Sequence, residues 1–241
     1  YFLYRLQNII EIFAKYITFV DSDDEIPQGT IEAMLDAAFE YDADIVQGSM
    51  DEKTLDGVIS HNYSNPLDTN ASKEAIKGFP CGKLFKAELF KNICFPEKYW
   101  FEDSNVSMLL VPRAKRLVTI PNVVYYYITN PNSITHTHKG KAKTIDSFYV
   151  TRSLLADQQR IKDRGEELDY RLEKMFDQIT NNWQRTFSLG LEIESAIFVL
   201  TCEMFVKRFP NPTSYDSKYK NLCESLMNKD FDIYRRECAF L

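Results

Sequence analysis

The order of strand-like and helix-like segments constrains the fold of this 241-residue chain more than any other feature. In the first half, two β-branched and aromatic runs, at 16–20 and 44–47, lie on either side of a helical pattern at 27–41. After about residue 140 only helical spacing remains. This order predicts an α/β domain over residues 1–140, followed by an all-helical region over residues 141–241.

The rest of the first half is less regular. Residues 51–72 lack a clear periodicity and are rich in Asn, Asp and Ser, which predicts a long loop or an irregular hairpin. The segments after it predict a turn entering a short helix at 82–91, a helix at 102–116 that is kinked or broken near Pro112, and two strands at 117–120 and 123–127 joined by a turn at Pro121-Asn122.

Three apolar stripes at helical spacing follow in the second half. They predict helices around 145–155 (ended by Gly165), 168–183 and 193–204, with prolines at 210 and 212 ahead of a polar, charged tail. Aromatic side chains on these stripes could contact a partner or a membrane surface, although packing within the helical region is the commoner reason for such a stripe. These aromatic residues are Phe148, Tyr149, Trp183, Phe198 and Phe205.

Composition excludes several classes of protein. With 44% hydrophobic and 14% aromatic residues, the chain is too rich in apolar side chains for a disordered protein. No apolar run reaches the roughly 18–20 residues that span a bilayer. The net charge of −6 argues against a general nucleic-acid binder, so no nucleic-acid partner is expected. The five cysteines form no CxxC pair, which favours free thiols in a reducing compartment.

The sharpest local signal is the acidic cluster Asp21-Ser-Asp-Asp24, directly after the first predicted strand. The carboxyl end of a strand is where α/β folds place their ligands. Clustered carboxylates repel one another, and a hard cation such as Mg²⁺ or Mn²⁺ offsets that repulsion while bridging to substrate phosphates. The alternative is that Asp24 caps the following helix. One aspartate suffices for a cap, so three favour the metal hypothesis.

Two further clusters are ambiguous from their chemistry alone. Glu102 and Asp103 precede a predicted helix, where acidic residues are also favoured by the helix dipole. His136 and His138 lie in a polar segment after a predicted strand, where one of them could be a metal ligand. Their spacing is weak support for a metal site.

The segment Tyr16-Ile-Thr-Phe-Val-Asp-Ser-Asp-Asp24 resembles the strand and DxD motif of family 2 glycosyltransferases, which have the GT-A fold. Further segments resemble that family in the family's own order, and together they cover roughly residues 8 to 138. They are Asp44-Ile-Val-Gln, Gly82-Lys-Leu-Phe-Lys86 with Glu88-Leu-Phe90, Phe95-Pro-Glu with Phe101-Glu-Asp103, and Val123 to Tyr127 followed by Asn132-Ser-Ile-Thr-His136.

The resemblance implies a GT-A-type mixed sheet flanked by helices, and it implies roles for individual residues. Asp21 and Asp23 would hold a Mn²⁺ or Mg²⁺ ion that bridges the nucleotide diphosphate, with Asp24 in support. Asp103 would be the general base that deprotonates the acceptor hydroxyl, with Glu102 as its neighbour. His136 would stand where related enzymes often have a third metal ligand.

The resemblance also implies partners and a location. The donor would be a nucleotide-diphosphate sugar and the acceptor a carbohydrate or glycoconjugate, with inversion at the anomeric carbon, in bacterial-type polysaccharide or glycoconjugate synthesis. The enzyme would be cytoplasmic. Two further hypotheses concern the helical region, which could associate peripherally with the inner face of the membrane or join two copies of the chain. The family's first strands, which grip the nucleotide base, would precede residue 1, so the chain is expected to be incomplete at its N-terminus.

Two alternatives come from other classes. Haloacid-dehalogenase-type phosphatases also end a strand in DxD, and there Asp21 would attack phosphate while Asp23 protonates the leaving group. Those enzymes usually continue with Gly-Thr, whereas this chain has Asp24-Glu25. The other alternative is a non-catalytic glycosyltransferase-like partner subunit, which the intact DxD and Glu-Asp pair disfavour.

Overall fold

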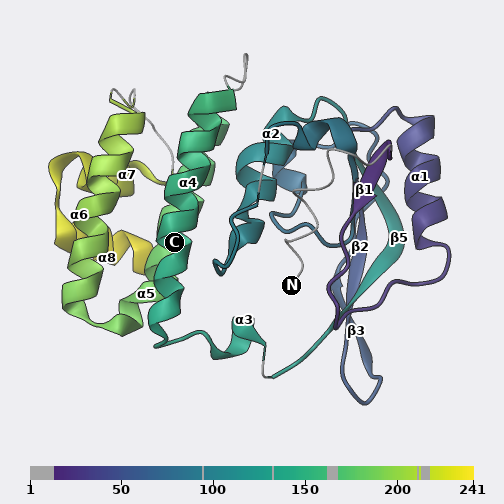
Figure 1. Ribbon diagram of the computed structural model, residues 1–241, viewed down its shortest axis with the longest axis horizontal. Helices are drawn as coiled ribbons and strands as arrows, with labels where there is room; N and C mark the ends of the chain where they lie inside the picture. The colour runs from purple at the N-terminus through teal and green to yellow at the C-terminus, as the bar shows by residue number, and fades with distance from the viewer. Residues whose placement is uncertain (1–13, 94, 132, 162–167, 211, 213–217) are drawn as a thin grey trace. The chain divides into compact units, whose positions relative to one another are not determined.

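The computed structural model describes residues 14–93, 95–131, 133–161, 168–210, 212 and 218–241. Cys94, Asn132 and the predicted helix end at Gly165 lie outside these ranges. The chain forms two compact units, which we describe separately (Figure 1). Of the described residues, those from 14 to 97 and from 105 to 133 form the first unit, and those from 98 to 104 and from 134 to 241 form the second. The sequence pattern alone had placed this division at residue 140.

The first unit is built on a mixed five-stranded sheet, with the strand order β1-β4-β2-β3 and β5 paired to β2. Strand β2 is central: β4 and then β3 pair with it antiparallel along one edge, and β5 runs parallel along the other. The predicted mixed sheet flanked by helices is therefore confirmed. The strands are β1 (Tyr16–Thr18), β2 (Ile45–Lys53), β3 (Ile59–Tyr63), β4 (Lys83–Lys86) and β5 (Leu117–Ile128).

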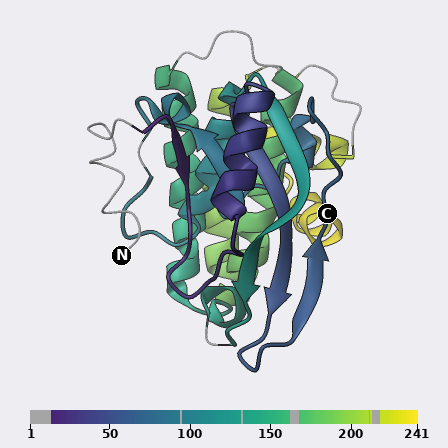
Figure 2. The ribbon, with the colours of Figure 1, turned by 90° about the vertical axis from the view of Figure 1, so that its right-hand side faces the viewer.

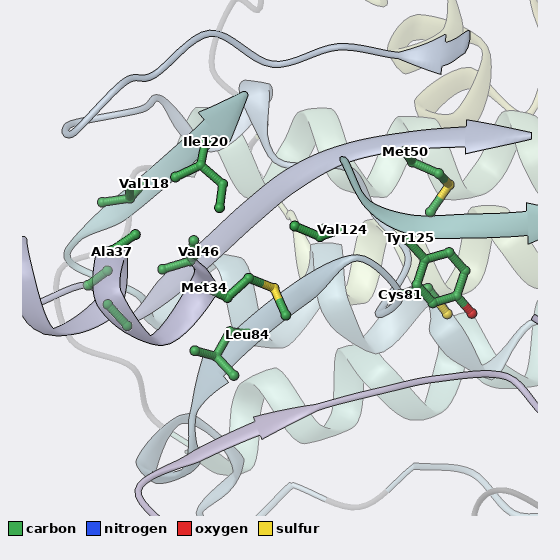
Figure 3. Packing of buried hydrophobic residues seen from close by; sticks show 12 residues of the cluster. Met34, Ala37, Val46, Met50, Cys81, Leu84, Val118, Ile120, Val124 and Tyr125 are labelled. Atoms are coloured by element: carbon green, nitrogen blue, oxygen red, sulfur yellow. The ribbon is translucent and has the colours of Figure 1, made fainter. Parts of the chain in front are cut away.

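Helix α1 (Thr30–Glu40) covers one face of this sheet (Figure 2). Met34 and Ala38 are buried, as their helical spacing predicts, and they belong to one core cluster with Val46 and Val118 of the sheet. Figure 3 shows Met34 with Val46 and Val118 in this cluster. The helix begins later than Pro27, because Gly29 precedes it in the left-handed conformation (φ 81°). No side chain caps this end, so the alternative role of Asp24 as the helix cap is wrong.

An aromatic cluster surrounds Phe19, the residue after β1. Its ring lies 5.8–5.9 Å from the rings of Phe85, Phe90 and Phe95, and all four side chains are buried. The Phe19 and Phe85 rings meet edge-on, which is a favoured geometry of aromatic pairs, and the other two pairs are tilted. The cluster fixes the end of the first strand, from which the acidic residues continue.

Three predictions for residues 82–127 are wrong. Residues 83–86 form a strand rather than only a turn before a helix, although a short 3₁₀ turn does follow at Ala87–Phe90. The single helix predicted over 102–116 is a 3₁₀ turn at Glu102–Ser104, a π-helical turn at Val106–Leu110 and one turn of helix, α2 (Val111–Arg113). Strand β5 continues through Pro121, where two strands had been expected.

The continuity of β5 has a physical cause in its pairing with β2. Gln47 pairs with Thr119 but Ser49 pairs with Val123, so β5 has extra residues between these two pairs. Pro121 cannot donate a ladder hydrogen bond and lies in this irregular part. Gly48 faces it closely: a Cβ at Gly48 would lie 2.4 Å from a methyl group of Val124. Only glycine therefore fits at this position without displacing β5.

Residues 51–72, predicted as a long loop or an irregular hairpin, contain both a hairpin and an irregular segment. Strands β2 and β3 form an antiparallel hairpin, and the chain from Ser64 to Ser72 is irregular. Asn65 ties that irregular part to the sheet, because its backbone N–H donates to Ser49 Oγ and its side chain donates to the Gly48 carbonyl. A 3₁₀ turn follows at Lys73–Ala75.

The second unit is helical, as predicted. The three expected helices are present, but the polar tail forms two further helices, which the sequence analysis missed. Their buried residues Leu222, Leu226, Tyr234 and Cys238 form the apolar side that gives them a reason to fold. The helices are α3 (Ile134–Thr137), α4 (Asp146–Ile161), α5 (Leu168–Thr186), α6 (Leu191–Arg208), α7 (Lys220–Asn228) and α8 (Phe231–Phe240), with 3₁₀ turns at Ala142–Ile145 and Phe187–Leu189.

Packing accounts for most of the aromatic residues on these helices. Phe148, Phe198 and Phe205 are buried inside the helical unit, whereas Tyr149 is 45% exposed. Trp183 stacks on Phe187 at 5.0 Å. Within the described ranges, every helix is too short or too polar to cross a bilayer. The described cysteines, Cys81, Cys202, Cys223 and Cys238, are buried free thiols.

Candidate active site

The residues singled out from the sequence fall in both units. Asp21, Asp23 and Asp24 belong to the first unit, while Glu102, Asp103 and His136 belong to the second. We describe the acidic turn of the first unit (residues 21–24) and the base segment of the second (residues 98–104) one after the other.

The acidic turn follows β1 and Phe19 directly. The Asp24 N–H donates to the Asp21 carbonyl at 3.1 Å, which closes the turn. Asp21 and Asp23 are exposed, and Asp24 is half-buried. The turn therefore presents two carboxylates outward and directs the third inward.

Tyr125 of β5 forms hydrogen bonds with the first and last residues of this turn. Its hydroxyl accepts a hydrogen bond from the Asp21 N–H (3.1 Å) and donates one to Asp24 Oδ2 (2.6 Å). The other oxygen of Asp24 accepts from the Ile128 N–H at 2.8 Å. Burial raises the pKa of Asp24, although these two hydrogen bonds act against that rise. Asp24 thus fastens the turn to β5, and both of its oxygens are engaged in doing so.

A second contact reaches the turn from Cys81, which pairs with Phe19 in a parallel bridge. The Cys81 thiol donates to Asp21 Oδ2 at 3.5 Å. Burial, followed by the charge of Asp21, raises the pKa of this thiol to about 12, so it remains a protonated donor at neutral pH. Lys83 orders the same stretch, because its buried ammonium group donates to the carbonyls of Phe79 (2.7 Å) and Cys81 (3.3 Å).

The acidic turn suits a hard divalent cation that is shared with a substrate. Mg²⁺ is typically held by one or two carboxylates plus substrate phosphates and water, and Asp21 and Asp23 offer two exposed carboxylates. Among the described residues, no group of three or more His, Cys, Asp or Glu side chains is arranged to hold a metal by itself. A cation here would therefore need oxygens from the substrate or from water.

The base segment is held in an unusual backbone conformation. Phe101 has a φ of 66°, in the left-handed region that bulky residues rarely occupy, and Glu102 and Asp103 follow in a 3₁₀ turn. Both acidic side chains are half-buried. The Arg185 guanidinium of α5 lies 3.8 Å from the centre of the Phe101 ring, and its charge interacts with that of Asp103.

The two histidines differ in their surroundings. His136 is exposed on the short helix α3. His138 is half-buried, and its ring meets the Phe101 ring edge-on at 5.9 Å. Its Nδ1 atom lies 3.0 Å from the Thr135 carbonyl oxygen. His138 thus contacts the base segment, while the role of His136 as a metal ligand stays a prediction.

Sequence reasoning missed Tyr125, Cys81 and Arg185. Tyr125 and Cys81 are 104 and 60 residues from Asp21 along the chain, so no local spacing relates them to the acidic turn. Both do lie in segments that carry the family resemblance or adjoin it, at the strand 123–127 and beside Gly82. Arg185 lies on a helix whose polar positions have no distinguishing pattern.

The chain was compared with known protein families and curated proteins. The sequence model of the family "Glycosyl transferase family 2" matches residues 10–96. "Glycosyltransferase GlyA" of Streptococcus pneumoniae serotype 4 (strain ATCC BAA-334 / TIGR4) is 27% identical over an alignment of 174 residues, and the match covers 64% of this chain. The matched part spans only 25% of GlyA, so this chain corresponds to about a quarter of that protein.

Solved structures of S. aureus TarS 1–349 have the same fold. The structure without a named ligand has a TM-score of 0.68 and 21% identity, over 98% of this chain and 68% of that one. The structure in complex with UDP-GlcNAc has a TM-score of 0.64 and 19% identity, over 98% and 70%. At this identity the likeness concerns the fold, which is the GT-A fold. Residues 10–96 are in addition similar in sequence to family 2 glycosyltransferases.

Proposed function

We propose that this protein is a metal-dependent, inverting glycosyltransferase that moves a sugar from a nucleotide-diphosphate sugar to an acceptor hydroxyl. The observation that carries the proposal is the braced acidic turn within the segment that matches the family. Asp21 and Asp23 are exposed there, while Tyr125 and Asp24 hold the backbone between them in place. The family match gives a phosphatase no comparable support.

Asp21 and Asp23 would hold Mn²⁺ or Mg²⁺. When bound, the cation neutralises negative charge on the diphosphate leaving group. The chain's own contribution is geometric: the Tyr125 hydroxyl and the Cys81 thiol restrain Asp21 from two sides. A carboxylate that is already held in place before the cation and the substrate bind loses less conformational entropy when it coordinates the cation.

Asp103 would act as the general base. Its carboxylate takes the proton of the acceptor hydroxyl while the acceptor oxygen bonds to the anomeric carbon. The bond from that carbon to the diphosphate oxygen breaks on the opposite face, so the configuration inverts. The proton ends on Asp103, the electron pair leaves with the diphosphate, and no covalent enzyme intermediate is needed. Glu102 would assist as the neighbouring carboxylate.

A UDP-sugar is the donor class we propose first, because structures of TarS, which has the same fold, are in complex with UDP and with UDP-GlcNAc. The acceptor would be a carbohydrate or glycoconjugate in bacterial-type polysaccharide synthesis. A cytoplasmic location fits the buried free thiols, which persist in a reducing compartment.

Calorimetric titration of the complete protein with UDP tests the metal site. We expect binding with Mn²⁺ or Mg²⁺ and a loss of that binding in EDTA. Asp23→Ala should weaken binding at least about tenfold and remove its metal dependence, because one of two outward carboxylates is lost. Asp36→Ala, at an exposed position on α1, is the matched control and should bind as the wild type does.

Two results would contradict the proposal. One is UDP binding of equal affinity with and without a divalent cation in both the wild type and Asp23→Ala. The other is hydrolysis of a generic aryl phosphate that depends on Asp21, which would favour phosphatase chemistry.

A further inference from the structure

The base segment, residues 98–104, lies apart in sequence from the helical region but belongs to its compact unit. Residues 98–104 therefore pack mainly with residues of the helical unit. Several contacts between the segment and the helices can be followed from its first residue to its last.

The start of the segment is attached to α4 and the turn before it. The Trp100 N–H donates to Asp146 Oδ2 at 2.9 Å. The Lys143 ammonium donates to the Lys98 carbonyl (2.8 Å) and to the same Asp146 oxygen (2.6 Å). One carboxylate and one ammonium group thus tie two backbone positions of the segment to the helical unit.

The end of the segment is attached to α5. The Ser104 hydroxyl donates to Gln178 Oε1 at 3.0 Å, and both side chains are buried. A buried hydrogen bond of this kind stabilises modestly when it is made, but leaving one partner unpaired costs about 1–3 kcal/mol. Ser104 is adjacent to Asp103, so this bond restrains the backbone at the candidate base.

Arg185, two turns further along α5, acts at the middle of the segment. Its guanidinium covers the Phe101 ring at 3.8 Å, well inside the range of a cation–π contact. Burial lowers the pKa of Arg185, and the charge of Asp103 opposes that effect. Its Nη1 atom is buried without a hydrogen-bond partner among the described residues. Arg185 is half-buried, and its guanidinium lies close to an aromatic ring and interacts with the charge of a carboxylate, Asp103.

The backbone of the segment needs such support. Lys98 and Phe101 both have positive φ values, 68° and 66°. Left-handed conformations of non-glycine residues cost on the order of 1–3 kcal/mol and persist where the surroundings impose them. Trp100 also meets the Phe101 ring edge-on at 6.2 Å, so the strained residue is held from two sides.

We propose that the helical unit positions the general base, with Arg185 and Gln178 of α5 as positioning residues for Asp103. The proposal rests on the proposed function in one respect, the role of Asp103 as the base. Arg185 fixes the Phe101 ring and balances the Asp103 charge, while Gln178 fixes Ser104. The helical region is then part of the catalytic apparatus, and neither residue needs to touch the substrate.

The test compares Arg185→Gln and Arg185→Lys in the complete protein, with Arg236→Gln on α8 as the matched control. Arg236 is exposed and pairs with Glu237, so its substitution removes the same charge away from the segment. Two measurements are made on each variant. One is hydrogen–deuterium exchange of the amides of residues 98–104, and the other is UDP release from UDP-GlcNAc with Mn²⁺, using water as the acceptor.

Arg185→Gln should speed exchange in the segment about tenfold or more, because the supported conformation opens more often. It should lower kcat by roughly 10- to 100-fold while the KM for UDP-GlcNAc stays within about twofold, because a displaced base affects chemistry rather than donor binding. Arg185→Lys keeps the charge and should recover part of kcat. Arg236→Gln should match the wild type in both measurements.

Unchanged exchange in Arg185→Gln overturns the proposal, as does an unchanged kcat in an active enzyme. If Arg185→Gln does not fold, Ser104→Ala removes the other tether and should raise exchange and lower kcat in the same directions; no change in either would overturn the proposal. If the wild type releases no UDP with any divalent cation, the function proposed for Asp103 fails. The exchange measurement then decides the positioning role by itself.

Discussion

The Tyr125 hydroxyl holds the acidic turn at both of its ends. It accepts from the Asp21 N–H and donates to the Asp24 carboxylate, so it joins the first and last residues of the turn. Burial is the main reason that the pKa of Tyr125 is raised, which keeps the hydroxyl protonated and able to donate. The residue combines an apolar ring in the core with a polar end at the site.

Tyr125→Phe should therefore affect both stability and metal-dependent binding. The ring stays in the core, but the Asp24 carboxylate and the Asp21 N–H lose a partner, which should lower the free energy of unfolding by about 1–3 kcal/mol. UDP binding with Mn²⁺ should weaken because Asp21 is less restrained. Urea unfolding and calorimetry measure the two effects.

Tyr127→Phe is the matched control for this prediction, since it removes a tyrosine hydroxyl from the same strand outside this bridge. If both variants unfold at the same urea concentration and bind UDP equally well, the hydrogen bonds of the Tyr125 hydroxyl contribute nothing to stability or to UDP binding.

The residue scale also shows what the sequence allows one to predict. Asp21 and Asp23 could be selected because a buried strand ending in several carboxylates is a local pattern, and the structure exposes both side chains. The partners that restrain Asp21 come from Cys81 and Tyr125, through chain topology that no local period encodes. Their place in the site follows only from the strand pairing.

At the scale of elements, Asp44 joins three strands at one corner of the sheet. Its Oδ2 atom accepts from the N–H groups of Lys115 (2.8 Å) and Arg116 (3.2 Å), just before β5. Its Oδ1 atom accepts from the Lys86 ammonium at the end of β4 (3.1 Å). Burial tends to raise the pKa of Asp44, but these hydrogen bonds and the Lys86 charge outweigh it and lower the pKa overall.

Asp44→Asn should destabilise the protein in a pH-dependent way. A carboxyl group with a lowered folded-state pKa contributes stability above its ordinary value of 3.8, and that contribution is lost as the pH falls through the folded-state pKa. We expect the variant to unfold about 1–3 kcal/mol more easily at pH 7. The difference should shrink below about pH 3.8, when the wild-type group takes up its proton.

Urea unfolding of both proteins across this pH range makes the measurement. Asp42→Asn is the control, because it removes a carboxylate near the same lysine from an exposed position. The Asp42 side chain is 88% exposed, and its oxygen is 3.7 Å from the Lys86 ammonium, compared with 3.1 Å for Asp44. A difference between Asp44→Asn and the wild type that does not change with pH would show that the charge of Asp44 is unimportant.

Strand β5 and the segment after Glu102 show why elements were harder to predict than their order. Pro121 normally ends a strand, yet β5 continues because the irregular pairing opposite Gly48 removes the need for its N–H. The apolar spacing after Glu102 is helix-like, but it is divided among 3₁₀, π and α turns. For β5, pairing with β2 outweighed local propensity.

At the scale of the whole molecule, the residues proposed for metal binding and for base catalysis belong to different units. Asp21 and Asp23 are in the sheet unit, whereas Asp103 is in the helical unit through the segment 98–104. A boundary drawn from periodicity at residue 140 could not reveal this, because the segment is too short to have a period of its own. The packing of Ser104 against Gln178 assigns it to the helical unit.

This division makes nucleotide binding and chemistry separable by mutation. Asp103→Asn keeps the size of the side chain but removes its ability to take a proton, so UDP release from UDP-GlcNAc with Mn²⁺ should fall by about 10²- to 10⁴-fold. Mn²⁺-dependent UDP binding should stay within about twofold of the wild type, since the acidic turn is untouched. Glu203→Gln, at an exposed position on α6, is the control and should change neither quantity. Turnover that survives Asp103→Asn would mean that another group takes the proton. A parallel loss of UDP binding would instead mean that Asp103 contributes to the nucleotide site.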